Sequence, residues 1–526
     1  MSKAYDAIII GGGHNGLVCA AYLARARKRT LVLEATDRVG GAAVTREIIP
    51  GFKVSACAHL LYLLHPKVLT DLRVQDHGFK LSARDMSTLA LAEDGRHLVL
   101  ATDSALTSAS LSAHSAADAV ALPAFQARIR RFARVIQRLL TETPPRLGTR
   151  NRSDQLALLK LAWSIRRLGR QDMREFLRIA GMNVADLLEE QFETDLLCGA
   201  YAFDAVLGTR LGPRSPNSTL TWFYRLAGGG KNGSNALAQP EGGMGALSDA
   251  LAASAKSAGA EIRTGSSVTQ IRVESDRVAG VVLDSGEEIK ADLVVSNADP
   301  KRTFLSLLGT QYLDTGFVRR IRDIPMRGTA AKLHLALDGL PSFSGVDRAQ
   351  LGGRLLIAPS IGYVERAFNH AKYGEYSEAP VLEITIPSLH DSTLTPAGKH
   401  VLSAIVQYAP SDLKGGWNDM REAFADNVID TLARYAPDLK DKIIARELLT
   451  PLDLEREFGM AGGHWHHGEL GLERFFMLRP VPGATQYATP LPGLYLCGAG
   501  CHPGGGVMGA AGMNAAREVL AGRVAA

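Results

Sequence analysis

Cysteine is scarce in this chain, which has five cysteines in 526 residues, at positions 19, 57, 198, 497 and 501. Cysteines so few and so scattered do not suit the disulfide framework of a secreted protein, and they indicate a reducing compartment. Cys497 and Cys501 form the single close pair. That pair has two interpretations: a redox-active dithiol, as in flavin disulfide reductases, or two small buried side chains around a glycine turn.

The sequence also lacks an uninterrupted run of 18 apolar residues, so we expect no helix that spans a bilayer. It passes from Met1-Ser2-Lys3-Ala4-Tyr5-Asp6 directly into an apolar run, without a charged leader and cleavage site, so we expect no export. A cytoplasmic protein, with peripheral membrane contact left open, is the resulting expectation. A chain with 46% hydrophobic and 21% charged residues at this length is expected to fold into two or three lobes.

A nucleotide-binding pattern stands at the start of the chain. The short β-branched run at residues 7–10 predicts a buried parallel strand, Gly11-Gly12-Gly13-His14-Asn15-Gly16 follows it, and residues 17–27 predict a helix. In G-x-G-x-x-G the first glycine permits the turn, the second lets the backbone approach a diphosphate, and the third lets helix and strand pack closely. A second strand, at 30–33, ends at Glu34, whose carboxylate suits ribose hydroxyls. This order of elements predicts a dinucleotide site.

Two further glycine clusters are present. The middle block runs from Gly242-Gly243-Met244-Gly245, through a hairpin of strands at 278–283 and 288–293, to Val295-Ser296-Asn297-Ala298-Asp299-Pro300. Near the C-terminus, a strand enters the glycine-dense turn Gly498-Ala499-Gly500-Cys501-His502-Pro503-Gly504-Gly505-Gly506, and a helix is predicted from about Met508 to Leu520. A helix start offers free amide donors and a positive dipole end, which suit the negative charge of a reduced flavin ring.

The segment Arg38-Val39-Gly40-Gly41-Ala42-Ala43-Val44-Thr45 resembles the R-x-G-G-x-x-x-T motif of the FAD-binding amine oxidase and carotenoid desaturase superfamily, and this favours FAD over NAD. The glycine turns at the start, middle and end are similar to those of the phytoene desaturase and carotenoid isomerase group. Residues 11–45, 48–52, 242–249 and 476–480 resemble most the branch called pyridine nucleotide-disulfide oxidoreductase domain-containing protein 2. No C-x-x-x-x-C pair lies near the first motif, so disulfide chemistry is not expected.

The resemblance implies an α/β fold in which a discontinuous Rossmann-like FAD-binding domain is joined to a mixed α+β substrate domain. We expect residues 1–70, 236–305 and 456–526 to form the FAD-binding domain, and residues 71–235 and 306–455 the substrate domain. The expected FAD-binding residues are spread over the three FAD-domain segments, with Val268 against the adenine: Gly11, Gly13, His14, Asn15, Gly16, Glu34, Ala35, Arg38, Gly40, Gly41, Ala42, Thr45, Val268, Asn297, Gly498, Ala499, Val507 and Met508.

The first insertion is expected to form a helical, basic cap at about 120–200, with helices at 122–140, 154–168 and 173–190. Between positions 128 and 178 there are fourteen Lys and Arg against four Asp and Glu, whereas the whole chain has a net charge of +5. The stretch 158–168 combines apolar residues, Trp163 and cations, which suits a helix on anionic lipid. A solvated basic face is the alternative, and no nucleic-acid-binding motif accompanies the charge.

Two residues are catalytic candidates. In the predicted strand at 331–337, alternation places Lys332, His334 and Ala336 on one face. A lysine on a comparable strand reaches flavin N5 through water in amine oxidase relatives, which by resemblance points to Lys332; an ordinary edge-strand lysine is the alternative. His502 could donate a proton near the ring or hold the turn structurally. Residues 464–467 are expected to line a pocket, with no metal site.

We therefore expect an FAD-dependent oxidoreductase that desaturates, saturates or isomerises an apolar, isoprenoid- or lipid-like substrate at CH–CH or C=C bonds. An amine oxidase-like enzyme that oxidises a C–N bond is one alternative, and a flavin-bound protein with mainly an interaction role is another. An aromatic cage in the cavity favours the amine, and a long apolar tunnel favours the lipid. The expected partners are a small apolar molecule and no nucleic acid, and a homo-oligomer remains open.

Overall fold

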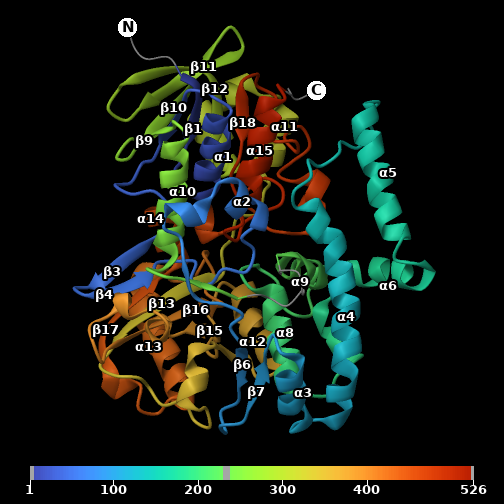
Figure 1. Ribbon diagram of the computed structural model, residues 1–526, viewed down its shortest axis with the longest axis vertical. Helices are drawn as coiled ribbons and strands as arrows, with labels where there is room; N and C mark the ends of the chain where they lie inside the picture. The colour runs from blue at the N-terminus through green and yellow to red at the C-terminus, as the bar shows by residue number, and fades with distance from the viewer. Residues whose placement is uncertain (1–4, 229–236, 523–526) are drawn as a thin grey trace.

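The computed structural model describes residues 5–228 and 237–522, which form two lobes, each around a seven-stranded sheet. Figure 1 shows the two ends of the chain at the same lobe, with the long helices of the first insertion along one side of the molecule. The remaining two sheets have two strands each. The expected combination of an α/β dinucleotide lobe and a mixed second lobe is confirmed.

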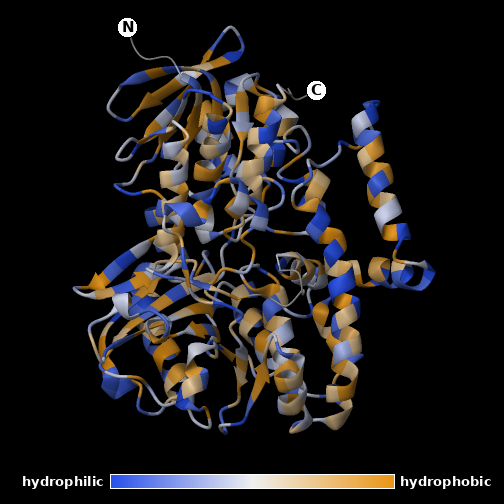
Figure 2. Cartoon of the chain, viewed as in Figure 1, coloured by the Kyte–Doolittle hydropathy of each residue, from blue (hydrophilic) through white to orange (hydrophobic). Residues whose placement is uncertain are grey.

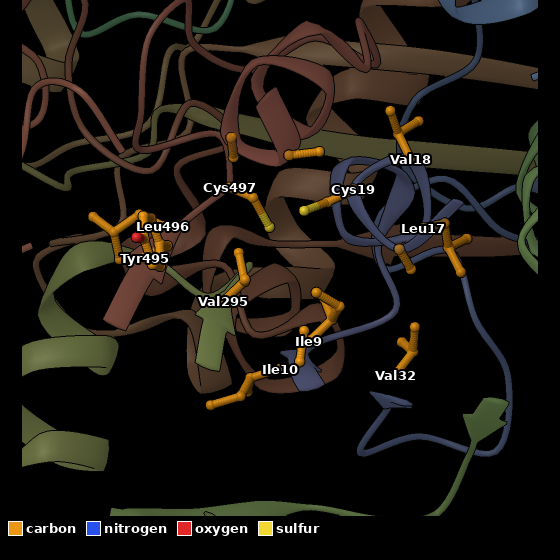
Figure 3. Packing of buried hydrophobic residues seen from close by; sticks show 14 of the residues in the cluster. Ile9, Ile10, Leu17, Val18, Cys19, Val32, Val295, Tyr495, Leu496 and Cys497 are labelled. Atoms are coloured by element: carbon orange, nitrogen blue, oxygen red, sulfur yellow. The ribbon is translucent and has the colours of Figure 1, made fainter. Parts of the chain in front are cut away.

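The first sheet has the strand order β10-β11-β12-β1-β2-β9, and β18 pairs with β12 beside this path. Its central strands run parallel, with Ile9 opposite Val32 on one side and Val295 on the other. These residues are fully buried, and Figure 3 shows this apolar core. The strand bounds are β1 Tyr5–Ile10, β2 Thr30–Leu33, β9 Glu261–Arg263, β10 Val268–Glu274, β11 Arg277–Leu283, β12 Glu288–Ser296 and β18 Leu494–Leu496.

The second sheet has the order β17-β13-β16-β15-β14-β6-β7 and is antiparallel except where β14 pairs with β6. One face packs on α13, Trp417–Tyr435, through an apolar cluster that includes Leu333, Leu382 and Leu402. The bounds are β6 Thr88–Leu91, β7 His97–Leu100, β13 Ala330–Leu337, β14 Arg354–Ile357, β15 Val381–Thr385, β16 His400–Gln407 and β17 Ile443–Leu449. The two small sheets pair β3 Thr45–Ile49 with β4 Phe52–Ser55, and β5 Leu81–Ala83 with β8 Gln239–Pro240.

Helices cover both sheets and form the cap. The dinucleotide lobe contains α1 His14–Arg25, α2 Pro66–Asp71, α10 Met244–Ser257, α11 Thr315–Arg322 and α15 Ala510–Leu520. The first insertion contains α3 Ser104–Ser112, α4 Ala116–Leu139, α5 Arg152–Arg166, α6 Arg170–Ala180, α7 Val184–Glu189, α8 Asp195–Val206 and α9 Ser218–Ala227. The second lobe also carries α12 Ile361–Lys372, and α14 Pro451–Phe458 follows β17.

Two helix predictions need correction. The single helix expected at 173–190 is interrupted, because Gly181 ends α6 and the Asn183 side chain accepts a hydrogen bond from the Asp186 backbone N–H at 2.8 Å to begin α7. The helix expected from Met508 begins only at Ala510, because Gly509 adopts a φ of +77°, which lies outside the helical region. The glycine turn before it is therefore longer than the sequence pattern indicated.

The two sheets are built from alternating segments of the chain. Strands of the first sheet come from 5–33, 261–296 and 494–496, and those of the second come from 88–100, 330–407 and 443–449. This alternation follows the discontinuous arrangement that we expected, while the exact domain limits stay a prediction. The limit placed between residues 235 and 236 lies outside the described residues. Within the described part of the chain, no helix is long and apolar enough to cross a membrane.

Candidate active site

A cavity of about 570 Å³ lies between the two sheets and is lined by residues of both lobes. This volume is within the ordinary range for small-molecule and cofactor sites. One part is formed by the glycine turns of the dinucleotide lobe, among them Gly11, Gly13 and Gly41. Another part is formed by Lys332, Glu383 and Ile405, which belong to the second sheet. The cavity therefore joins the predicted nucleotide site to the lobe that we expected to hold substrate.

The start of α1 has the features of a diphosphate cradle. Gly13 precedes the helix with extended backbone, and no side chain caps the helix start, which leaves the first amide N–H groups free for an anion. A Cβ on Gly16 would meet the carbonyl oxygen of Gly11 at 2.2 Å, so the close packing of helix and strand requires glycine there. Two buried side-chain atoms that line this part, His14 Nε2 and Asn15 Oδ1, lack a hydrogen-bond partner within the protein.

The second glycine motif lies directly against the first. Gly40 donates its backbone N–H to the carbonyl oxygen of Gly12 at 2.9 Å, and Gly40 forms a bridge to Gly13. Glu34 accepts hydrogen bonds from Gly12 N–H at 2.7 Å and from Thr36 N–H at 3.0 Å, which fixes its carboxylate at the end of β2. The free amides, the unpaired polar atoms and the two glycine turns fit the diphosphate and ribose of FAD.

Fourteen of the eighteen residues expected to bind FAD line the cavity: Gly11, Gly13, His14, Asn15, Glu34, Ala35, Arg38, Gly40, Gly41, Ala42, Val268, Asn297, Ala499 and Val507. The other four do not. Gly16 packs against β1, and Thr45 donates its hydroxyl to Gly242 at 2.9 Å. Gly498 lies against the backbone of Asn297, and the Met508 carbonyl accepts the N–H of His65. These four support the walls of the site from behind.

Lys332 lies in the interior of the second sheet, because β13 is flanked by β17 and β16. The edge-strand interpretation of this lysine is therefore wrong. Lys332 is opposite Ile405 on β16, and Ile405 is opposite Glu383 on β15. Residues directly opposite one another in an antiparallel ladder share a face of the sheet. A cation and a carboxylate two strands apart therefore face the cavity together, and both are 2% exposed.

His59, from the loop after β4, bridges these two charges. Lys332 Nζ lies 2.7 Å from His59 Nδ1, and His59 Nε2 lies 3.1 Å from Glu383 Oε1. A carboxylate favours a protonated nitrogen beside it, so His59 donates from Nε2 to Glu383 and accepts from Lys332 at Nδ1. Burial lowers the pKa of Lys332 to about 7, although Glu383 opposes this. Burial and then the charge of Lys332 lower the pKa of His59 to about 4, so the imidazole is neutral.

Behind Glu383, a network of buried charges connects the sheet to the helical cap. Arg354 on β14 is 2.5 Å from Glu383 Oε2 and 2.5 Å from Asp204 on α8. Arg225 on α9 is 3.2 Å from Asp204 and 3.4 Å from Glu383, and its guanidinium lies 4.2 Å from the ring centre of Tyr62. Against the cost of burial, Arg354 holds the pKa of Glu383 well below its usual value. Glu383 is therefore an ionised carboxylate with both oxygens engaged.

Sequence reasoning missed His59, Glu383 and the network behind them. Glu383 carried a signal, because it is the single charged residue in the apolar strand Val381–Thr385. Arg354 carried a similar one at the start of the apolar strand Arg354–Ile357. His59 lies in a loop of mixed composition and carried none. Of the segment 464–467, which was expected to line a pocket, Trp465 and His467 line the cavity, and His464 and His466 do not.

The structure does not place His502 in the cavity. Its side chain is fully buried and its Nε2 is 2.7 Å from the carbonyl oxygen of Leu139, so it ties the C-terminal turn to the end of α4. Burial lowers its pKa to about 4, which leaves it neutral. Of the two roles considered for His502, this geometry favours the structural one over proton donation.

The thiol pair lies outside the cavity, and the histidine cluster does not form a metal site. Cys497 and Cys501 are buried and absent from the lining of the cavity, and Cys497 faces Cys19 in the core (Figure 3). Burial raises the pKa of Cys501 to about 12, so a thiolate is disfavoured. In the described residues, no group of three or more His, Cys, Asp or Glu side chains is arranged to hold a metal ion.

A dinucleotide lobe whose glycine turns open into a cavity shared with a second lobe is the arrangement of flavoenzymes, and the chain is an FAD-dependent oxidoreductase. Residues 16–520 match the family described as flavin containing amine oxidoreductase, and the chain belongs to that family. The FAD expected from the sequence is thereby confirmed as the cofactor, and the resemblance to this superfamily is confirmed as well.

The similarity to known proteins extends over almost the whole chain. Pyridine nucleotide-disulfide oxidoreductase domain-containing protein 2 of Rattus norvegicus is 39% identical over 542 residues, covering 98% of this chain and 93% of the rat protein. A limonene dehydrogenase polypeptide of Castellaniella defragrans is 27% identical over 548 residues, covering 98% of this chain and 94% of that protein. Among solved structures, cyclohexylamine oxidase from Brevibacterium oxydans has a TM-score of 0.59 at 16% identity, covering 99% of this chain and 98% of that one, and it shares the fold.

Proposed function

We propose that this enzyme desaturates, saturates or isomerises a neutral, mainly apolar substrate at CH–CH or C=C bonds. The observation that carries the proposal is the state of the carboxylate beside Lys332. Both oxygens of Glu383 are engaged, by His59 on one side and by Arg354 and Arg225 on the other. A cationic amine would therefore find no free carboxylate next to Lys332, and it would meet Lys332 itself.

The other carboxylates that line the described cavity lie elsewhere. Glu34 is fixed at the end of β2, and Glu457 is paired with Arg46 at 2.8 Å. The side chain of Asp37 is 81% exposed. The lining around Lys332 is apolar in Leu60, Leu207, Ala330, Ala331 and Ile405. Burial of hydrocarbon in such a lining is favourable, whereas burial of an unpaired ammonium is costly.

FAD, when bound, supplies the chemistry of accepting or returning two electrons with a hydrogen. The amides at the start of α1 and the turn at Gly40 and Gly41 would hold its diphosphate, and Glu34 would hold its ribose. Val268 would contact the adenine, while Ala499 and Val507 would contact the ring. All of these residues line the cavity or border it, and the assignment of Val268 to the adenine rests on the resemblance to related flavoproteins.

Lys332 is the group that holds or moves a proton beside the substrate. Its Nζ is fixed by His59, and its pKa of about 7 keeps both protonation states accessible at neutral pH. The second sheet and the helical cap bury it, so bulk water does not compete at this atom. A relative whose name assigns it limonene, an alkene, is compatible with a substrate of this class.

Oxidation of a C–N bond is the second candidate. It is favoured by the family description and by three aromatic residues in the cavity lining, Tyr62, Phe458 and Trp465, which could contribute to an aromatic cage. Arg225, however, lies 4.2 Å from the Tyr62 ring centre. A cation already beside this ring disfavours a second cation from the substrate.

The test is anaerobic mixing of the FAD-loaded enzyme with two substrate panels, one of cyclic and acyclic alkenes and alkanes and one of primary amines. The proposal expects loss of the visible flavin absorbance with members of the first panel, or altered double-bond geometry by chromatography when alkenes meet the reduced enzyme. Lys332→Met is expected to slow either reaction by about a hundredfold, whereas Lys290→Met, an exposed position, is not. Reduction by amines alone would establish the second candidate, and no reaction with either panel would favour an interaction role.

A further inference from the structure

Helix α5 carries an apolar stripe that none of the residues in 5–228 and 237–522 covers. Figure 1 shows α5 and α6 at the side of the molecule, and Figure 2 shows apolar and polar residues mixed along α5. Leu156, Leu159 and Trp163 are 57%, 65% and 64% exposed. At about 100° per residue, positions 156, 159 and 163 lie on one face of the helix. A stripe of two leucines and a tryptophan thus faces outward.

The opposite face of α5 is the one that packs on the protein. Leu161 and Ile165 pack against the apolar cluster of the cap. Asp154 is buried, 3.1 Å from Arg146 and 2.9 Å from the side chain of Gln486. One side of α5 therefore packs on the protein, and the exposed stripe lies on the opposite side.

Cations accompany the stripe. At the same 100° per residue, four cations share a sector about 120° wide with the apolar stripe: Arg152, Lys160, Arg166 and Arg167. We call this sector the α5 outer face. All four are exposed. Among the described residues, none of the four has a carboxylate within salt-bridge distance, whereas Arg178 of α6 is paired with Glu175 and Glu190. The α5 outer face thus presents unpaired positive charge together with apolar bulk.

The partner that matches both properties is an anionic lipid surface. Leucine and tryptophan side chains insert at the boundary of headgroups and acyl chains, while Lys and Arg remain at the level of lipid phosphates. A second copy of this chain on a twofold axis would set the four cations against four more, which is unfavourable. A nucleic acid would satisfy the charge and leave the three apolar side chains in water.

We propose that the α5 outer face docks on membranes that contain anionic lipid, with α5 lying in the plane of the interface. Leu156, Leu159 and Trp163 enter the acyl boundary, and Arg152, Lys160, Arg166 and Arg167 contact phosphate groups. The proposal is independent of which bond the enzyme oxidises.

Trp163 makes the proposal directly measurable. Of the four tryptophans, Trp222 and Trp417 are buried and Trp465 is half-buried, so Trp163 is the exposed one. The FAD-loaded protein would be mixed with vesicles of pure phosphatidylcholine and with vesicles that contain phosphatidylglycerol. Binding is followed by co-flotation, and the environment of Trp163 by its fluorescence emission, at low and high salt.

Two variants test the face itself. The first is the triple variant Leu156→Ser, Leu159→Ser, Trp163→Ser, and the second is Lys160→Glu with Arg167→Glu. The matched apolar control is Leu106→Ser, Tyr373→Ser, Leu472→Ser, at positions that are 57%, 68% and 54% exposed elsewhere on the surface. The matched charge control is Arg319→Glu with Arg322→Glu on α11. Flavin content and helicity are measured for each, and exposed positions are expected to leave both unchanged.

The expected result is flotation with anionic vesicles and not with neutral ones, a blue shift of Trp163 emission, and release at high salt. Each α5 variant is expected to lower the partition constant about tenfold or more, and both controls to keep it. Equal binding by the triple variant, equal binding to neutral vesicles, or no binding would overturn the proposal. Loss of a dimer in the triple variant without vesicle binding would assign the face to a second copy, and binding to single-stranded DNA instead of vesicles would assign it to nucleic acid.

Discussion

Lys332 Nζ is 2.7 Å from His59 Nδ1, although the two residues are 273 positions apart in the chain. The contact places a lysine and a neutral imidazole at buried positions, with Glu383 on the far side of the ring. Because Glu383 is held ionised by Arg354 and Arg225, the orientation of His59 is fixed, and His59 in turn fixes the amine of Lys332. The protonation state of this one amine consequently influences both stability and chemistry.

The free energy of unfolding should depend on pH through the titration of Lys332. Its pKa falls from the ordinary 10.5 to about 7 on folding, chiefly because it is buried. Between these two pH values the unfolded chain holds a proton that the native protein lacks. The free energy of unfolding of the wild type therefore rises with pH over this range. Lys332→Met removes the effect. We expect the variant's advantage over the wild type to be greatest below pH 7 and to shrink steadily toward pH 10.5.

Chemical denaturation of both proteins at a series of pH values measures this difference. Lys290→Met, at an exposed position, serves as the control and should give a difference that does not change with pH. A constant difference between Lys332→Met and the wild type across the same range would show that Lys332 titrates normally in the folded state.

The pH dependence of flavin reduction should report the same amine. A neutral lysine can accept a proton and an ammonium cannot, so the rate constant for substrate oxidation is expected to rise as the pH increases through about 7. His59→Phe deletes the acceptor that stabilises the ammonium, and the midpoint should therefore move to lower pH. Glu383 and Cys57 act directly on Lys332. Arg354 acts on the neighbouring His59, and Arg46 acts on the neighbouring His334.

Stopped-flow reduction of the FAD-loaded enzyme by a substrate from the first panel gives the profile. His59→Gln, which can still accept through its amide oxygen, is expected to keep a midpoint nearer that of the wild type. A midpoint unaffected by His59→Phe, in a variant that retains its flavin, would remove His59 from the control of Lys332.

FAD binding should depend on the absence of a side chain at Gly13. A Cβ there would lie 2.8 Å from Asn297 Nδ2 and would narrow the approach to the start of α1. Gly13→Ala is expected to raise the dissociation constant of FAD about tenfold or more, equivalent to about 1.4 kcal/mol. Gly181→Ala is the matched control, because nothing lies within 4 Å of a Cβ at Gly181. The flavin-to-protein absorbance ratio and the recovery of free flavin fluorescence on dilution give the measurement, and unaltered binding in Gly13→Ala would contradict the cradle.

The parts of this site that the sequence predicted are the local ones. The strand, glycine turn and helix from Ala7 to Arg25 are adjacent in the chain, and each glycine has a steric reason within that short segment. The shared face of Lys332 and His334 also follows from the two-residue period of one strand. Val268 and Asn297 were placed through the resemblance to known flavoproteins, which carries long-range information that periodicity lacks.

The parts that were not predicted depend on strand order and on turns in irregular backbone. Lys332 meets Glu383 only because β16 lies between β13 and β15 in a particular register, and no pattern within one strand specifies its neighbours. His502 sits in the glycine turn assigned to the ring, yet the backbone there directs its side chain to Leu139 of α4. Proximity in sequence to a binding motif therefore did not determine the direction of the side chain.

Removal of one charge from the buried network behind the site should lower the free energy of unfolding, and removal of an opposite charge as well should restore part of it. Arg354 is 1% exposed and bridges Glu383 and Asp204. Arg354→Met leaves two buried carboxylates with Arg225 as their remaining cation, at a cost of about 3–5 kcal/mol in unfolding free energy. Adding Asp204→Asn removes one of the two negative charges, so the double variant is expected to be more stable than Arg354→Met alone.

Arg272→Met breaks exposed pairs with Glu274 and Glu288 and should cost about 0–1 kcal/mol. Denaturant unfolding of the four proteins decides the point, since equal stability of Arg354→Met and Arg272→Met would mean that the network is hydrated and contributes little.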